Sequence, residues 1–279
     1  MSICCSIKNS VLSVNKQGKQ CKNFLRLFYH FLELTIFMNI NTITISAGDY
    51  TIGNESFALS RPLHILPIKS FAIMQGTVTN QQFANFVSAG GYRIEDYWSE
   101  MGLRWRKSKA SIIPAFWDDA NFNAPEQPVV GISWYEALAF ANWLSIETGD
   151  VWRLPSEVEW EAAASFDGTG TIHTAASGLR KTIPAIGTGY QSSHGVWNLR
   201  GNVWEWCSTR WGRNWQSLDY SYPYDASDGR EDLSGSYARV MRGGSWFDPL
   251  QEAHPAKRAR YLPGSRGSNI GFRLIRSII

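Results

Sequence analysis

Arg242-Gly-Gly-Ser-Trp246 and, further along the chain, Ile270-Gly-Phe-Arg-Leu274 bracket the stretch that decides how this sequence folds. The residues between them include Phe247-Asp-Pro-Leu-Gln-Glu-Ala-His254 and Tyr261-Leu-Pro-Gly-Ser-Arg-Gly-Ser-Asn269. They show neither the period of two expected of a half-buried strand nor the period of 3.6 expected of a helix. The bracketed segment, residues 247–269, is therefore predicted to be irregular backbone between two fixed ends.

The composition is that of a globular protein with one substantial core. The 279 residues are 44% hydrophobic and 18% charged, and they include 13 tryptophans and 24 glycines, which predicts aromatic side chains packed beside tight turns. The net charge is only +3, and no run of Lys and Arg forms a stripe that would neutralise phosphates. Nucleic acid is therefore not an expected partner.

Cysteine usage indicates a reducing compartment. Cys4, Cys5 and Cys21 lie near the N-terminus, and only Cys207 lies in the aromatic-rich body of the chain. No disulfide framework is possible there, so we predict a cytoplasmic protein in which Cys207 is a packed thiol.

Residues 1–37 differ in composition from the rest of the chain and are predicted to be an N-terminal extension to a domain at residues 38–279. The apolar run from Phe24 to Phe37 superficially resembles a signal sequence, but Arg26, His30 and Glu33 interrupt it. It lacks a small-residue cleavage site and is too short to span a membrane. We expect a disordered or weakly helical extension, or one that is not translated, and a helix on a membrane surface is the alternative.

Alternation from Ile40 to Ile45, followed by Ala47-Gly-Asp49, predicts a strand that enters a β-hairpin. Three stretches predict helices with polar N-caps: residues 77–87 with Thr79 or Asn80, residues 133–144 with Ser133, and residues 155–164 with Ser156. In the last two a glutamate follows the cap by three residues and completes a capping box. Beyond them, Gly, Pro and aromatic residues predict short strands and long loops.

Seven motifs occur in order: Val78-Thr-Asn80, Gly91-Tyr92, Pro128-Val-Val-Gly-Ile-Ser-Trp134, Arg153-Leu-Pro-Ser-Glu-Val-Glu-Trp160, Gly201-Asn-Val-Trp-Glu-Trp206, Arg242-Gly-Gly-Ser-Trp246 and Gly271-Phe-Arg273. From about residue 42 onward the chain thereby resembles the formylglycine-generating enzyme, or sulfatase-modifying factor, superfamily. The resemblance implies an α+β, C-type-lectin-like domain of the sulfatase-modifying-factor type, with two or three helices, short strands and much irregular loop.

The same resemblance argues against the chemistry of those enzymes. They hold copper through two cysteines shortly after the Gly-Gly-Ser-aromatic motif, because soft thiolates suit Cu(I). Here the first position falls near Asp248 and the second between Gln251 and Ala253, so no copper is expected. The His-rich iron site of the related sulfoxide synthases has no counterpart either. The alternatives are an oxidase or another protein-modifying enzyme with an unrecognised site, and a sensor or accessory domain.

The bracketed segment also resembles the diversified C-terminus of variable proteins made by diversity-generating retroelements. That resemblance implies a non-catalytic protein that binds a protein or cell-surface ligand. The implied contact residues are Phe247, Asp248, Leu250, His254, Tyr261, Leu262, Gly264, Ser265, Gly267 and Ser268. Trp211, Trp215, Tyr220, Tyr222 and Tyr224 either form the floor of the same site or pack in the core. The alternative is an ordinary loop of a degenerate family member.

The family resemblance further implies a structural calcium site at Asn198, Gly201, Val203 and Glu205, since oxygen ligands suit a hard cation. The alternative for Glu205 is a buried carboxylate bonded to backbone amides. Arg242, Arg258 and Arg273 are expected in buried ion pairs and aromatic stacking. Gly243, Gly244 and Gly271 are expected to allow positive φ or close backbone approach.

Overall fold

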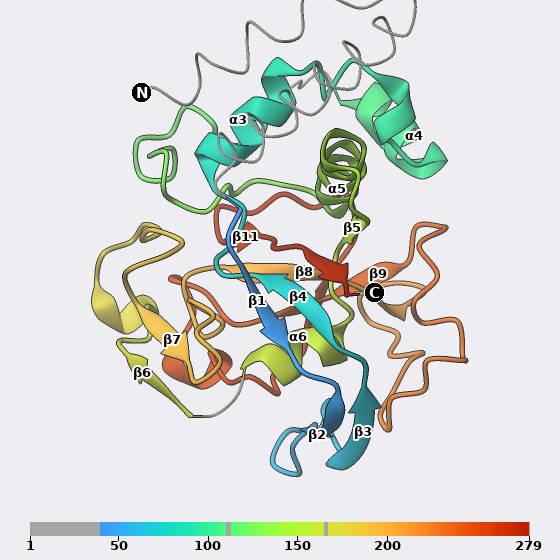
Figure 1. Cartoon of the computed structure of the whole chain (residues 1–279), viewed down its shortest axis with the longest axis vertical. Coiled ribbons are helices and arrows are strands. Elements are labelled where there is room, and N and C mark those ends of the chain that lie inside the picture. Colours follow the sequence, from blue (N-terminus) through green and yellow to red (C-terminus); the bar gives the residue numbers. More distant parts are fainter. Residues whose placement is uncertain (1–39, 110–112, 165–166, 279) are drawn as a thin grey trace, which may run out of the picture. The chain divides into compact units, whose positions relative to one another are not determined.

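The computed structural model describes residues 40–109, 113–164 and 167–278 (Figure 1). Chain from Ile40 onward clusters as one compact unit, and the predicted extension at residues 1–37 lies outside the described residues. None of the helices in these ranges has the length and apolar character needed to cross a bilayer.

One four-stranded sheet joins strands from both ends of the described chain. Its order is β1 (Thr42–Ile45), β4 (Phe71–Met74), β12 (Ile275–Ser277) and β5 (Trp152–Arg153). Strand β4 lies between β1 and β12 and is antiparallel to both, so that Ile73 is opposite Ile43 on one side and Ile275 on the other. All four residues of β4 are buried, which explains why it takes a central position.

The predicted strand near Ile40–Ile45 is confirmed as β1, but the predicted hairpin is wrong. Strand β2 (Gly48–Ile52) pairs with β3 (His64–Ile68) over five residue pairs, while β1 pairs with β4. The turn signal at Ala47-Gly-Asp49 marks a change of direction only. The distant, fully buried β4 offers β1 a better apolar partner than its polar neighbour β2, of which only Ile52 is buried.

The second four-stranded sheet explains the sequence bracket. Its order is β10 (Ala259–Tyr261), β9 (Ala238–Arg242), β8 (Trp204–Gly212) and β11 (Ile270–Gly271). The bracketed segment leaves the sheet after β9, adds β10 as an edge strand, and returns as β11, parallel to β8, with Ile270 opposite Trp204. Both ends of the segment are thus fixed to one sheet whose long strand β8 is buried throughout.

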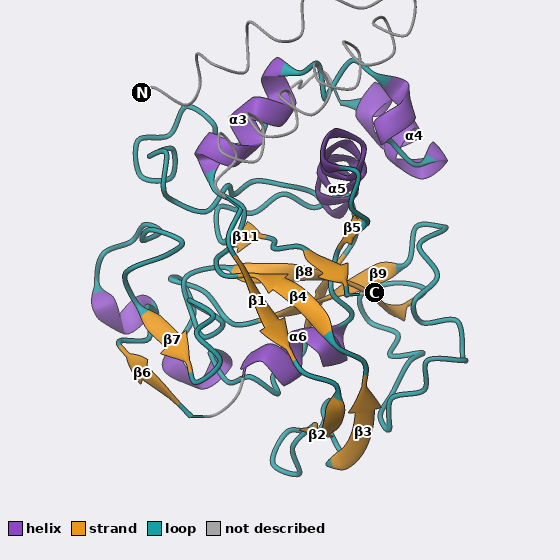
Figure 2. Cartoon of the chain, in the orientation of Figure 1, coloured by secondary structure: helices purple, strands orange, loops and turns teal. Residues whose placement is uncertain are grey.

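Irregular backbone dominates the rest of the described chain, as predicted (Figure 2). The remaining strands are β6 (Gly168–Gly170) and β7 (Tyr190–Ser192), which pair with each other as a two-stranded sheet. Short 3₁₀ turns occur at η1 (Glu95–Tyr97), η2 (Ala175–Ser177) and η3 (Leu250–Glu252). The last of these lies inside the bracketed segment.

The three predicted helices are confirmed as α3 (Asn80–Ser88), α5 (Trp134–Thr148) and α6 (Glu157–Ala164). Thr79 and Ser133 cap the first two in complete capping boxes, and Ser156 and Glu159 exchange the same pair of bonds before α6. Helix α4 (Glu100–Ser108) was not predicted, because only Gly102 of its nine residues is buried and the apolar periodicity is weak. Figure 1 shows α3, α4 and α5 on one side of the strands and α6 on the other.

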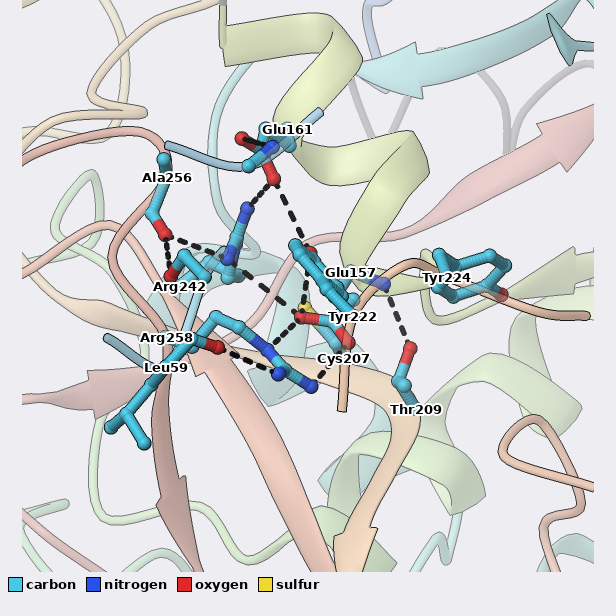
Figure 3. Close-up of polar contacts among 12 residues, drawn as sticks. Leu59, Glu157, Glu161, Cys207, Thr209, Tyr222, Tyr224, Arg242, Ala256 and Arg258 are labelled. Atoms are coloured by element: carbon cyan, nitrogen blue, oxygen red, sulfur yellow. Dashed lines mark hydrogen bonds and ion pairs between the residues drawn. The ribbon is translucent and has the colours of Figure 1, made fainter. Parts of the chain in front are cut away.

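A buried network of four charges joins α6 to β9 and to the bracketed segment. Arg258 forms a bidentate pair with Glu157, at 2.7 Å from Nε to Oε2 and 2.8 Å from Nη2 to Oε1. Arg242 pairs with Glu161, and its second terminal nitrogen lies 3.7 Å from Glu157. Figure 3 shows both arginines pointing toward the two carboxylates. Two positive and two negative charges balance, as a buried ionic cluster requires.

The same network also binds two further loops and a second point of the bracketed segment. Arg258 donates to the carbonyls of Leu59 and Tyr220, at 2.9 and 3.1 Å, and Arg242 donates to the carbonyl of Ala256 at 3.3 Å. The Arg258 guanidinium also lies over the rings of Trp211 and Tyr222. The scaffold roles predicted for Arg242 and Arg258 are therefore confirmed.

Aromatic residues beside this network belong to the core. Trp211 and Tyr222 are buried, so the packing alternative holds for them, whereas Trp215 remains half exposed. Cys207 is buried in the same cluster, and burial raises the pKa of its thiol well above the usual value. The prediction of a packed thiol at Cys207 is confirmed.

Removing one arginine of the network should be severely destabilising. Arg258→Met leaves Glu157 buried without its bidentate partner, so we expect the free energy of unfolding to fall by about 3–5 kcal/mol. The matched control is Arg104→Met, because Arg104 pairs with Glu100 on the exposed face of α4 and should change stability by less than about 0.5 kcal/mol. Urea unfolding of the two variants measures the difference, and equal losses would contradict a structural role for the network.

Candidate ligand-binding surface

The start of the bracketed segment is fixed by backbone geometry. Gly243 and Gly244 have φ of 108° and 74°, which strongly favours glycine. A Cβ on Gly244 would stand 2.7 Å from the Cα of Ala253, and one on Gly271 would stand 2.9 Å from the carbonyl oxygen of Val129. Positive φ at the first two glycines and close approach at the third are thus confirmed.

Asp248 is tied to the scaffold by its side chain and its backbone. Its Oδ2 accepts hydrogen bonds from the indole N–H of Trp204, at 2.9 Å, and from the hydroxyl of Ser245. Its carbonyl accepts the N–H of Ala175 at 3.0 Å. Asp248 lies near the first position matched to the copper cysteines and presents an engaged carboxylate. The second position, between Gln251 and Ala253, runs from an exposed Gln251 to a fully buried Ala253.

His254 supports a turn in the middle of the segment. Its Nδ1 accepts the N–H of Ala256 at 3.1 Å, and its ring packs edge-on against Phe57 with centroids 4.7 Å apart. Burial, with the nearby charges of Arg200 and Lys257 among others, lowers the pKa of His254 to about 4. The ring is therefore neutral near pH 7, as its acceptor role requires.

The end of the segment is held against α4 and α5. Arg266 forms a bidentate pair with the buried Glu136, at 2.9 and 2.5 Å, and lies over the ring of Trp105. A Cβ on Gly264 would stand 2.6 Å from Nε1 of Trp105. The carbonyls of Pro263, Gly267 and Ser268 complete the attachment by accepting hydrogen bonds from Trp134, Gly131 and Trp246.

Four of the ten predicted contact residues are large apolar side chains that face solvent. Phe247 is 68% exposed, Tyr261 52%, Leu250 50% and Leu262 45%. Burying a side chain of this size is worth about 1.5–3 kcal/mol. Single exposed apolar residues are ordinary, so these four are candidate contact residues because they belong to one anchored segment. The other six predicted residues are engaged in local structure or are partly buried.

Sequence reasoning missed the aromatic support beneath Phe247. Phe247 packs edge-on against Trp246, which in turn contacts Phe122, and Phe122 contacts Phe116. Phe116 and Phe122 lie in a loop without periodicity, so only their aromatic character could have marked them. These aromatic contacts restrict the position of the exposed Phe247 ring.

The residues predicted to bind calcium are bonded to protein donors. Both carboxylate oxygens of Glu205 accept from Arg273, at 2.6 and 2.7 Å, and Oε2 also accepts the indole N–H of Trp160 at 2.8 Å. Oδ1 of Asn198 accepts the N–H of Tyr190. Within the described residues no three His, Cys, Asp or Glu side chains are placed to hold a metal.

N–H groups occupy acceptor positions on the side-chain oxygens of Glu205 and Asn198 that calcium would also need. Glu205 is a buried carboxylate, as the alternative held, although its donors are side chains and not backbone amides. The scaffold role predicted for Arg273 is confirmed. Calcium binding through Asn198, Gly201, Val203 and Glu205 stays a prediction that calcium titration of the melting temperature can test.

The chain is similar in sequence to proteins of known name. It is 31% identical to a hercynine oxygenase of Mycolicibacterium thermoresistibile over 80% of this chain and 55% of that protein. It is 28% identical to a formylglycine-generating enzyme of Streptomyces coelicolor over 83% of this chain and 87% of that one. The chain thus spans only about half the length of the hercynine oxygenase.

Among solved structures, Treponema denticola variable protein 1 matches with a TM-score of 0.63 and 22% identity, covering 85% of this chain and 95% of that one. This likeness concerns the fold, and it confirms the predicted α+β, C-type-lectin-like class. Residues 33–278 match the family described as "Sulfatase-modifying factor enzyme 1-like domain". The chain therefore belongs to the sulfatase-modifying factor enzyme 1-like domain family.

Proposed function

We propose that this chain is a non-catalytic ligand-binding protein that displays the bracketed segment as a variable surface, and that its partner is a protein or a cell-surface molecule. The observation that carries the proposal is the exposure of Phe247, Leu250, Tyr261 and Leu262 on backbone that is fixed between anchors. The anchors are the pairs Arg258–Glu157 and Arg266–Glu136, together with the ends of β9 and β11.

A fixed backbone that carries exposed side chains suits the recognition of a partner molecule. Because the anchoring contacts hold the backbone in place, exposed side chains can change without disturbing the fold. Rigid aromatic side chains also lose little conformational entropy on binding, so more of their contact energy is retained as affinity. Phe247 on its aromatic base and Tyr261 on the edge strand β10 are the expected anchors of the contact.

An oxidase or another protein-modifying enzyme of the same family is the second candidate. The relatives named hercynine oxygenase and formylglycine-generating enzyme favour it. Against it stand Asp248 and the stretch from Gln251 to Ala253 at the positions of the copper cysteines, since none of these residues offers a thiolate. Cys207 is no substitute, because burial raises the pKa of its thiol and keeps it protonated.

A diversified surface should be visible in a growing population. Deep sequencing of the gene should show variation between the codons of Trp246 and Ile270, concentrated at residues 247, 250, 261 and 262. Codons of the anchors Arg258 and Arg266 should be invariant, because their side chains complete buried ion pairs. An adenine-rich near-copy should lie downstream. If all genes in the population had the same sequence and no adenine-rich near-copy lay downstream, the proposal that the segment is variable would be wrong.

Exposed and anchored positions of the segment should differ in stability. Tyr261→Ala should change the free energy of unfolding by less than about 0.5 kcal/mol, because the side chain is half exposed. Gly264→Leu should cost about 1–3 kcal/mol, because its side chain collides with Trp105. Urea unfolding of both variants decides this. A larger loss for Tyr261→Ala than for Gly264→Leu would show that Tyr261 belongs to the core.

The enzymatic alternative can be tested directly. Purified chain incubated with Cu(I), dioxygen and a cysteine-containing peptide should leave the peptide mass unchanged, because the two thiolate ligands are missing. A fair control is Asp248→Cys combined with Ala253→Cys, which should gain copper affinity if the fold tolerates both changes. Conversion of the peptide thiol by the unaltered chain would overturn the non-catalytic proposal.

A further inference from the structure

A hollow of about 350 Å³ lies at the start of α3. The first turns of α3 form one wall, and the loop at residues 117–125, which Figure 1 shows passing beside α3, forms the other. None of the residues that line the hollow belongs to the bracketed segment. Its volume is at the lower end of the range for small-molecule sites.

Hydrogen bonds between the helix and the loop hold the two walls together. Nδ2 of Asn80 donates to the carbonyls of Phe122 and Ala124, at 2.7 and 2.9 Å. The backbone N–H of Gln81 donates to the carbonyl of Pro125 at 3.0 Å. Asn80 is only 7% exposed, and both of its amide hydrogens are used. Its side chain is therefore fixed, and Oδ1 is left as an acceptor on the hollow.

Trp117 supplies an aromatic part of the wall. It packs against the fully buried Phe83, with ring centroids 6.2 Å apart. This contact with the core restricts the indole, which is itself half-buried and lines the hollow. An indole presents a flat apolar face and one N–H donor to a ligand.

The polar side-chain groups on the hollow include both donors and acceptors without a hydrogen-bond partner among the described residues. They are Oδ1 of Asn80, the indole N–H of Trp117, the amides of Gln81 and Asn123, and the carboxylate of Asp118. Asp118 is the single charge among the lining residues, and no Lys, Arg or His of the described chain forms an ion pair with it.

This lining fits an uncharged ligand that is rich in hydroxyl groups. Hydroxyls donate and accept, as amides do, so the two kinds of group satisfy each other. A purely apolar ligand would remove the polar groups from water without replacing their hydrogen bonds, which costs free energy. An anionic ligand would be repelled by Asp118. The aromatic surface of Trp117 requires that the ligand also has an apolar face.

We propose that this hollow binds a neutral sugar ring, whose hydroxyls bond to Asn80 and Asn123 and whose C–H face packs on Trp117. Gln81 adds an exposed amide to the rim. Because Asn80 and Trp117 are held by the core and by the loop, little entropy is lost in ordering them when the sugar binds. The site is independent of the bracketed segment and of whatever that segment binds.

The test is titration of the full chain at neutral pH, followed by saturation-transfer NMR. The neutral probes are the methyl glycosides of glucose, galactose, mannose and N-acetylglucosamine, and tetramethylammonium is the cationic probe. At least one glycoside should bind, with the strongest transfer to its ring C–H protons. Gln81→Ala should weaken its binding by at least about threefold. The matched control is Gln216→Ala, which removes an exposed amide outside the hollow and should leave binding unchanged.

Removal of the aromatic wall by Trp117→Ala should abolish glycoside binding. If that variant does not fold, Ala84→Phe replaces it, because Ala84 lines the hollow from the surface of α3 and a larger side chain there should fill the site. Failure of every glycoside to bind the unaltered chain would overturn the proposal. So would glycoside binding that Ala84→Phe does not affect, or binding of tetramethylammonium alone that is lost in Asp118→Asn.

Discussion

The buried charge network of Glu157, Glu161, Arg242 and Arg258 is the constraint on which the rest of the structure depends. It fixes α6 to β9, holds the middle of the bracketed segment, and reaches the carbonyls of Leu59 and Tyr220. A chain with so much irregular backbone has few ladders to define its loops. The buried ion pairs fix the positions of these loops, because a misplaced loop would leave an uncompensated charge in the core.

The sequence predicted the local features well, because local chemistry decides them. Capping residues at Thr79, Ser133 and Ser156 mark three helices, and the glycine pair at 243–244 marks the turn after β9. Strand pairing was not predictable in the same way. Strand β1 pairs with the distant β4 and not with its sequence neighbour β2. Helix α4 shows too little apolar periodicity to be recognised from the sequence.

The candidate surface was predictable as a segment but not residue by residue. In irregular backbone, exposure depends on distant partners: Asp248 is held by Trp204, Gly264 packs on Trp105, and Arg266 pairs with Glu136. No spacing within residues 247–269 reveals these contacts. Family membership defines this fold, while the side chains mounted on it determine the function.

Strand β12 lies between β4 and β5, and it comes last among the strands of the described residues. Strand β5 pairs in that sheet with β12 alone. Strand β5 therefore cannot join β1 and β4 until residues 275–277 have been synthesised and have paired with β4. During synthesis, β1 and β4 can pair early, but the sheet closes only across some two hundred residues of intervening chain, a separation that slows folding. Folding is thus completed after translation of this region, and the growing chain exposes the apolar edge of β4 until then.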